Sequence, residues 1–210
     1  MNNMSRLYKE SKSPEEFAGS YLNYLSDLLK GLDLKAIAGF IGEFEDARRT
    51  GNTVFLTGNG GSAATASHMA NDIALDVLKK SGTKNPFRVL ALSDSIPLIT
   101  AIGNDDGYEN IFLYQLKIHY RPGDRLVVIS ASGNSPNVVL AAQWVKERGG
   151  RVIGLLGFDG GKLQALCDVA ITVKTPKGEY GPVEDIHMVM DHLIANYLLG
   201  KTLQETASQR

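Results

Sequence analysis

The apolar residues of this chain recur at helical spacing near the N-terminus and form short continuous runs further along. Residues of about 14–30 and 33–49 show the helical spacing, and "SPEEF" places Ser13 at a helix cap and Pro14 at the first helical position. Apolar runs at 53–58, 87–92, 124–130, 151–157 and 169–175 alternate with segments of helical length. Such runs are typical of strands covered on both faces. The pattern predicts a doubly wound α/β fold, in which helices flank a parallel sheet of about five strands, with an N-terminal helical extension.

We expect one structural unit, because 210 residues are enough for one sizeable core. Helices within residues 1–50 are expected to pack on this core and at an oligomer contact, and residues 51–210 to form the domain that holds the sheet. A last helix is expected from about Pro182 to Leu199. Its apolar stripe would consist of Ile186, Val189, Met190, Leu193, Ile194 and Tyr197.

The charge and hydrophobicity of the chain exclude some classes of binding partner. The formal net charge is −1 and charged residues make up 21% of the chain, so no overall basic field favours nucleic acid or an anionic membrane. The apolar runs are shorter than the roughly 18 residues that span a bilayer, and the N-terminal sequence lacks the apolar core of a signal peptide. We therefore expect a soluble, cytoplasmic protein. The single cysteine, Cys167, excludes an internal disulfide and a cysteine-based metal site.

Two loops that follow predicted strands are rich in glycine, serine and asparagine: "TGNGGSA" at 57–63 and "SASGNSPN" at 130–137. Ligands of open parallel sheets bind beyond the carboxyl ends of the strands, where such loops lie. In the first loop glycine permits close backbone approach, and Ser62 can cap the next helix. The second loop carries three hydroxyls, those of Ser130, Ser132 and Ser135, just before a predicted helix. The free N–H groups at the start of that helix favour an anion. A phosphate can be bound there without a basic neighbour.

Neither loop fits a nucleotide-binding motif. Ala63 stands where G-x-G-x-x-G needs its third glycine, and Lys162 is followed by Leu163, so that G-K-[ST] is absent from the sequence. Dinucleotide and ATP binding are therefore disfavoured.

Histidines and carboxylates recur at helical spacing in two places. His68 and Asp72 are four residues apart, so one helix face would present both side chains to an ion or substrate. The last helix carries Glu184, Asp185, His187, Asp191 and His192. Glu184 and His192 lie about 80° apart, opposite the expected apolar stripe, and so face a cleft or another subunit. His187 and Asp191 form an equally good pair, and spacing alone leaves the choice of zinc ligands open.

Four segments together resemble the phosphoheptose isomerase family of SIS (sugar isomerase) domains: "GNGGSAATASHMANDI", "AIGNDDGYENIF", "ISASGNSPNVV" and "VEDIHMVMDHLI". The resemblance runs over nearly the whole chain, including the N-terminal helices. It implies a phosphosugar-binding SIS domain in homotetramers with sites at subunit contacts. It also implies isomerisation of sedoheptulose 7-phosphate to D-glycero-D-manno-heptose 7-phosphate through an enediol, an early step towards activated heptose for surface polysaccharide such as lipopolysaccharide.

The resemblance also assigns roles to residues. It implies that the sugar is held by Asn59, Gly60, Gly61, Asn104 and Asp105, and the phosphate by the loop with Ser130, Ala131, Ser132 and Ser135. We also count Ser62 and Glu184 among the substrate-binding residues. The implied ligands of one zinc ion are His68, Asp72, Glu184 and His192, and the implied acid and base are Asp72 and His192.

Three positions depart from the family's usual residues: Asp72 replaces a glutamate, Glu184 a glutamine and Ala131 a threonine. The first change draws the carboxylate back by one methylene, and the second adds a negative charge beside the metal. These changes favour the first of two alternatives, and the second arises because the family includes a relative that binds a protein instead of acting as an isomerase. One is an isomerase that acts on a different sugar phosphate. The other is a non-catalytic regulator that senses a sugar phosphate or binds the replication initiator DnaA.

Overall fold

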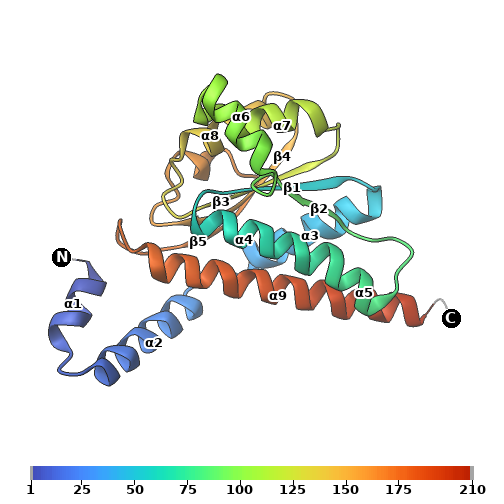
Figure 1. Ribbon diagram of the computed structural model, residues 1–210. Coiled ribbons are helices and arrows are strands. Elements are labelled where there is room, and N and C mark those ends of the chain that lie inside the picture. The colour runs from blue at the N-terminus through green and yellow to red at the C-terminus, as the bar shows by residue number, and fades with distance from the viewer. Residues whose placement is uncertain (1, 209–210) are drawn as a thin grey trace.

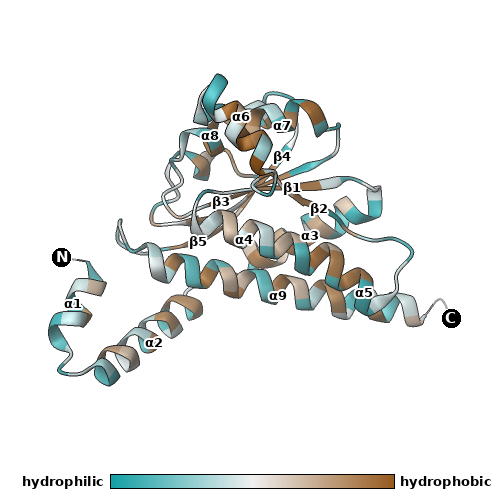
Figure 2. Ribbon diagram, viewed as in Figure 1, coloured by the Kyte–Doolittle hydropathy of each residue, from teal (hydrophilic) through white to brown (hydrophobic). Residues whose placement is uncertain are grey.

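The apolar runs form the strands of a parallel sheet (Figure 1). Within residues 2–208, which the computed structural model describes, these are β1 (Thr53–Thr57), β2 (Arg88–Ala91), β3 (Arg125–Ser130), β4 (Arg151–Gly157) and β5 (Val169–Val173). Each of the expected strands is confirmed. Figure 2 shows apolar residues gathered along the strands, as burial of both sheet faces requires.

Helices cover both faces of the sheet (Figure 1). One face packs against α3 (Leu34–Thr50), α4 (Gly61–Ala70), its π-helical continuation (Asn71–Asp76), α5 (Val77–Ser81) and α9 (Tyr180–Ala207). The other packs against α6 (Ile96–Asp105), α7 (Ile111–His119) and α8 (Pro136–Lys146). Short 3₁₀ turns lie at Tyr108–Asn110 and Gly161–Ala165. The layers confirm the doubly wound fold.

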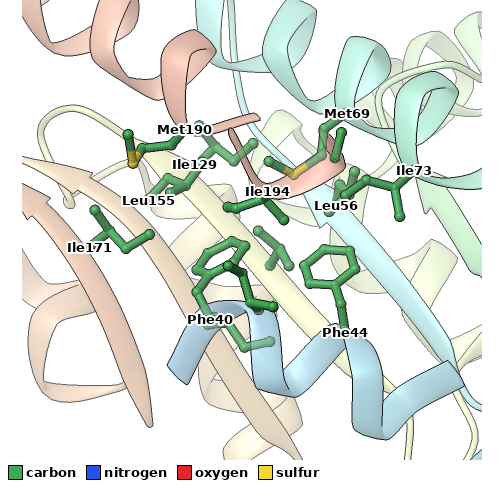
Figure 3. Packing of buried hydrophobic residues seen from close by; sticks show 14 of the residues in the cluster. Phe40, Phe44, Leu56, Met69, Ile73, Ile129, Leu155, Ile171, Met190 and Ile194 are labelled. Carbon is green, nitrogen blue, oxygen red and sulfur yellow. The ribbon is translucent and has the colours of Figure 1, made fainter. Parts of the chain in front are cut away.

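Aromatic and aliphatic side chains fill the space between α3, α9 and the sheet (Figure 3). Phe40 and Phe44 of α3 stack with ring centroids 5.7 Å apart, and both are fully buried. They lie beneath Ile129 of β3, while Met190 and Ile194 bring α9 into the same cluster. Burial of such side chains is worth about 1.5–3 kcal/mol each, so this layer holds α9 firmly against the sheet.

An N-terminal arm of two helices, α1 (Asn3–Glu10) and α2 (Pro14–Lys30), extends from the body (Figure 1). The expected start of α2 is confirmed, because Ser13 accepts a hydrogen bond from the N–H of Glu16 and Pro14 is the first helical residue. The sequence patterns did not predict α1. All residues of both helices are exposed or half-buried.

The expected apolar stripe of α9 is wrong at three positions. Val189, Leu193 and Tyr197 are 42%, 41% and 52% exposed, whereas His187 and Asp191 are fully buried. The physical reason is that α9 packs both on the sheet and beside α4 and α5. The side of α9 that its neighbours cover is therefore not the most apolar side of the helix, and this buried side includes polar residues.

The order of the strands is β2-β1-β3-β4-β5, so it reverses between β1 and β3. In open sheets this switch point creates a crevice beyond the carboxyl ends of the strands, where ligands bind. The loops after β1 and β3 border this crevice. They are the two glycine- and serine-rich loops that the sequence predicts to bind a ligand. Among the helices of residues 2–208, none is both long enough and apolar enough to cross a membrane.

Candidate active site

The backbone of the loop after β1 lies so close to other groups that side chains would not fit at two of its glycines. Gly60 adopts a φ of +53°, which disfavours any side chain. A Cβ at Gly58 would lie 2.6 Å from the carbonyl carbon of Ser62, and one at Gly61 would collide with the carboxylate of Glu184. The expectation that Ser62 caps α4 is wrong: Gly60 is the N-cap residue, and Ser62 is buried within the first turn.

The loop after β3 presents its serines around a tight turn. Ser130 Oγ accepts a hydrogen bond from the N–H of Gly133 at 3.1 Å, and Ser132 Oγ accepts one from the N–H of Asn134 at 3.3 Å. Because each hydroxyl accepts from the backbone, its own proton can be donated to a ligand. Ser135 is the N-cap residue of α8, so the first N–H groups of that helix open onto the same turn.

A pair of asparagines joins the two loops. Asn59 Nδ2 donates to Asn137 Oδ1 at 2.9 Å, and Asn137 Nδ2 donates to Asn59 Oδ1 at 2.8 Å. Tyr108 also donates to Asn59 Oδ1, at 3.0 Å. These bonds fix the β1 loop relative to the β3 loop and leave little freedom to the backbone between them.

Between these loops and the start of α9 lies a pocket of about 190 Å³, which we call the serine pocket. Seven of the expected substrate residues line it, together with Ile129 and Tyr180: Asn59, Ser62, Ser130, Ala131, Ser132, Ser135 and Glu184. Asn104 and Asp105 are not among them. Both are exposed at the end of α6, where Asn104 Nδ2 donates to Asp105 Oδ1 at 2.7 Å.

Two histidines and an aspartate converge between α4 and α9, further along both helices. Nε2 of His68 lies 3.1 Å from Nε2 of His192 and 3.4 Å from Oδ2 of Asp72, and His192 Nε2 lies 3.9 Å from the same oxygen. Donor atoms of one tetrahedral zinc ion, each about 2.0–2.1 Å from the metal, are about 3.3 Å apart. The observed separations therefore fit a zinc ion without a change in the fold.

Asp191 completes this group of side chains, which we call the histidine cluster. The ligand atoms of His68, Asp72, Asp191 and His192 all lie within 4.8 Å of one another. Burial, followed by the charge of Asp72, raises the pKa of Asp191 to about 7. His187 lies apart from the cluster. Its Nε2 is 3.1 Å from the carbonyl oxygen of Leu156, and burial lowers its pKa to about 4.

The serine pocket and the histidine cluster form the two ends of one strip. Gly61 meets Glu184 at the first end, and His68 meets His192 at the second, so α4 and α9 run side by side in the same direction. At a rise of 1.5 Å per residue, these pairs lie about 10–12 Å apart along the two helices. The π-helical turn Asn71–Asp76 begins at the second end and contains Asp72, and such turns are frequent at functional sites.

Comparison with known proteins identifies the family. A model described as the SIS domain matches residues 20–157. The phosphoheptose isomerase of Rhodospirillum rubrum is 40% identical over 159 residues, which cover 76% of this chain and 82% of that protein. That of Trichlorobacter lovleyi is 41% identical over 156 residues, 72% of this chain and 77% of its own. The chain belongs to the phosphoheptose isomerase family of SIS-domain proteins.

A solved structure extends this relationship to the whole fold. Phosphoheptose isomerase GmhA from Neisseria gonorrhoeae has a TM-score of 0.77 and 27% identity, and the match covers 89% of this chain and 98% of that one. The resemblance and the fold class are thereby confirmed. The SIS match ends with β4, so the residues on α9 lie beyond it.

Sequence reasoning missed two residues of this candidate site and left a third as one of several alternatives. Asn137 stood in the quoted serine loop, and its amide pair with Asn59 became visible only when the two loops met. Tyr180 lines the serine pocket from the first turn of α9, a position that no pattern marked. Asp191 was one of several polar residues on the last helix; His187 is buried as well, and the position of Asp191 in the histidine cluster distinguishes it from the rest.

Proposed function

We propose that the protein is an aldose–ketose isomerase that converts sedoheptulose 7-phosphate into D-glycero-D-manno-heptose 7-phosphate through an enediol. The observation that carries the proposal is the distance of about 10–12 Å between the serine pocket and the histidine cluster. An extended chain advances about 1.2 Å per bond, so an open seven-carbon sugar phosphate spans about 10 Å from phosphorus to carbon 1. Such a substrate reaches from one end of the strip to the other.

The serine pocket is the proposed phosphate site. Ser130 and Ser132 have hydroxyl protons to donate, and the N-terminus of α8 opens onto the same turn. Glu184 lines the same pocket and lies beside bare backbone at Gly61, where a sugar hydroxyl can be held. With the phosphate bound here, carbons 1 and 2 lie at the histidine cluster.

At the histidine cluster, Asp72 and His192 are proposed to move the protons. Asp72 takes a proton from carbon 1 and returns it to carbon 2 through the carboxylate oxygen that is not used for the metal, while His192, when its ring nitrogen is not bound to the metal, transfers a proton from oxygen 1 to oxygen 2. The carbonyl group passes from carbon 2 to carbon 1, and no oxidant or reductant is needed. The carboxylate of Asp72 is half-buried between α4 and α9, which limits its contact with water.

Zinc is the proposed metal, with His68, Asp72 and His192 as ligands. Their nitrogen and oxygen atoms already have separations that suit one ion. When bound, the metal would supply Lewis-acid stabilisation of the negative charge that develops on the substrate.

We further propose a homotetramer with sites at subunit contacts. The arm of α1 and α2 has few contacts with its own body, and α9 exposes Val189, Leu193 and Tyr197. Light scattering at micromolar concentration should give four times the chain mass of 22.7 kDa. A monomer would contradict the proposal.

The decisive experiment is proton NMR of the purified protein with a panel of ketose phosphates of different lengths. We expect an aldose signal from sedoheptulose 7-phosphate, and weaker or no turnover of five- and six-carbon analogues that do not span the strip. Turnover of a shorter ketose phosphate alone would assign another substrate. No turnover of any member would favour a non-catalytic sensor.

A further inference from the structure

Asp191 is a carboxylate in an unusual setting. It is fully buried on α9, and among the described residues neither of its oxygens has a hydrogen-bond partner. A buried carboxylate without a partner is costly, and proteins normally pair such a group with a cation or a hydrogen-bond donor. Ligand atoms of His68, Asp72 and His192, the other members of the histidine cluster, lie within 4.8 Å of one of its oxygens.

Asp191 and His192 reach the histidine cluster from different sides. The two residues are consecutive on α9, and their side chains leave the helix about 100° apart. His192 is exposed and approaches from the rim, whereas Asp191 approaches from the buried side. His68 and Asp72 approach from α4 and its continuation, so four donor atoms from the two helices lie within 4.8 Å of one another.

Glu184 belongs to the other end of the strip. It precedes His192 by eight residues, or about 12 Å along α9, and its carboxylate lies against Gly61 at the serine pocket. In the described part of the chain, the group of donors within 4.8 Å of one another does not include it.

We propose that Asp191 is the fourth protein ligand of the zinc ion, so that this chain binds the metal through His68, Asp72, Asp191 and His192. Two imidazole nitrogens and two carboxylate oxygens are a donor set that suits zinc. The ion would neutralise the buried charge of Asp191, which explains why a carboxylate is tolerated there without a hydrogen bond. This inference rests on the proposed metal of the preceding section, and it leaves Glu184 free to bind the substrate.

The test is zinc affinity, measured by competition with a chromophoric chelator, in the full-length parent and in three variants. Asp191→Asn keeps the size of the side chain but removes its charge, and we expect its zinc affinity to fall by about 10- to 100-fold or more. Glu184→Gln should keep the parent affinity, and so should the matched control Asp76→Asn, whose carboxylate pairs with Lys80 one turn beyond Asp72. Cobalt in place of zinc should give different ligand-field bands in Asp191→Asn and unchanged bands in the other two.

A fold control accompanies these measurements. Metal-free Asp191→Asn should melt at or above the temperature of the metal-free parent, because a buried unpaired charge has been removed. Added zinc should then raise the melting temperature of the parent more than that of the variant. Unchanged zinc affinity and cobalt bands in Asp191→Asn would overturn the inference, as would loss of affinity in Glu184→Gln alone. A parent that binds no zinc would also overturn it. In that case the NMR assay still decides separately whether the protein is an isomerase.

Discussion

Asp72 carries the proton transfer in the proposed reaction, and its replacement tests that role directly. Asp72→Asn preserves size and removes the base, so turnover should fall by about a hundredfold to ten-thousandfold. The Michaelis constant should change little, since affinity rests mainly on the serine pocket. The measurement is steady-state turnover of sedoheptulose 7-phosphate, with Asp76→Asn as a control on the same π-helical turn. Full activity in Asp72→Asn would exclude Asp72 as the base.

Ser130 tests the phosphate site. Its hydroxyl is placed to donate to a charged oxygen, and such bonds are worth about 1.5–3 kcal/mol, so Ser130→Ala should raise the Michaelis constant by roughly 10- to 150-fold. Turnover at saturation should change much less. Inorganic phosphate should also protect the parent against heat better than it protects the variant. Equal protection of both would place the phosphate elsewhere.

At the scale of elements, two tyrosines attach α2 to the start of α9. Tyr21 donates to Asp185 Oδ2 at 2.5 Å, and Tyr24 donates to Glu179 Oε2 at 2.6 Å. Burial and the adjacent carboxylates raise the pKa of Tyr21 above its ordinary value, and they raise that of Tyr24 to about 12. Both phenols are therefore protonated while the arm is attached to the body.

The attachment of the arm should depend on pH with a definite sign. Because the folded-state pKa of each phenol is above the ordinary value of about 10, these bonds contribute fully below pH 10; the contribution of Tyr24 is lost as the pH rises from 10 to 12, and that of Tyr21 persists to higher pH. The protection of the amides of residues 3–30, measured as their exchange rate relative to that of an unstructured chain at the same pH, should fall over that range. In Tyr24→Phe, exchange should already be faster at neutral pH and depend less on pH. The exposed Tyr8→Phe serves as the control, and identical pH profiles in parent and Tyr24→Phe would contradict the assignment.

At the scale of the whole molecule, an ion-pair network ties α3 to the amino ends of two strands. Glu43 accepts from Arg151 Nε at 2.7 Å and from Arg125 Nε at 3.2 Å, and Arg125 also pairs with Asp46. The side chains of Glu43 and Arg125 are only 11% and 8% exposed. The network lies at the amino ends of these strands, whereas the site lies beyond the carboxyl ends. It therefore contributes to stability and not to substrate binding.

Removing Glu43 should therefore destabilise the fold and spare the site. Glu43→Ala removes a carboxylate shared by the nearly buried Arg125, which keeps its pair with Asp46, and the half-exposed Arg151, so we expect a loss of about 1–3 kcal/mol in the free energy of unfolding. Urea denaturation measures it. Asp27→Ala, which removes an exposed pair with Lys30, should change stability little. A similar small change in Glu43→Ala would show that the network is dispensable. The turnover of folded Glu43→Ala should match that of the parent.

How far the sequence anticipates this protein differs between elements. The central strands β1, β3 and β4 were predictable because a strand buried on both faces is mostly apolar over five to seven consecutive residues. The start of α2 was predictable because a cap and a proline act on their own helix. The short α1 carries Met4, Leu7 and Tyr8 at helical spacing, but eight residues are too few for that spacing to distinguish a helix, and none of them is buried.

For the site, the sequence by itself determined the parts that are local. The spacing of His68 and Asp72 on one helix face and the serines of the β3 loop depend on neighbours in the chain, and the structure places both as expected. Only the tertiary structure decided which side of α9 is covered. That side depends on the sheet, α4 and α5 together, so Leu193 is exposed and Asp191 is buried against the histidine cluster. A carboxylate acquires its role there from what surrounds it, because burial removes the water that would otherwise stabilise its charge.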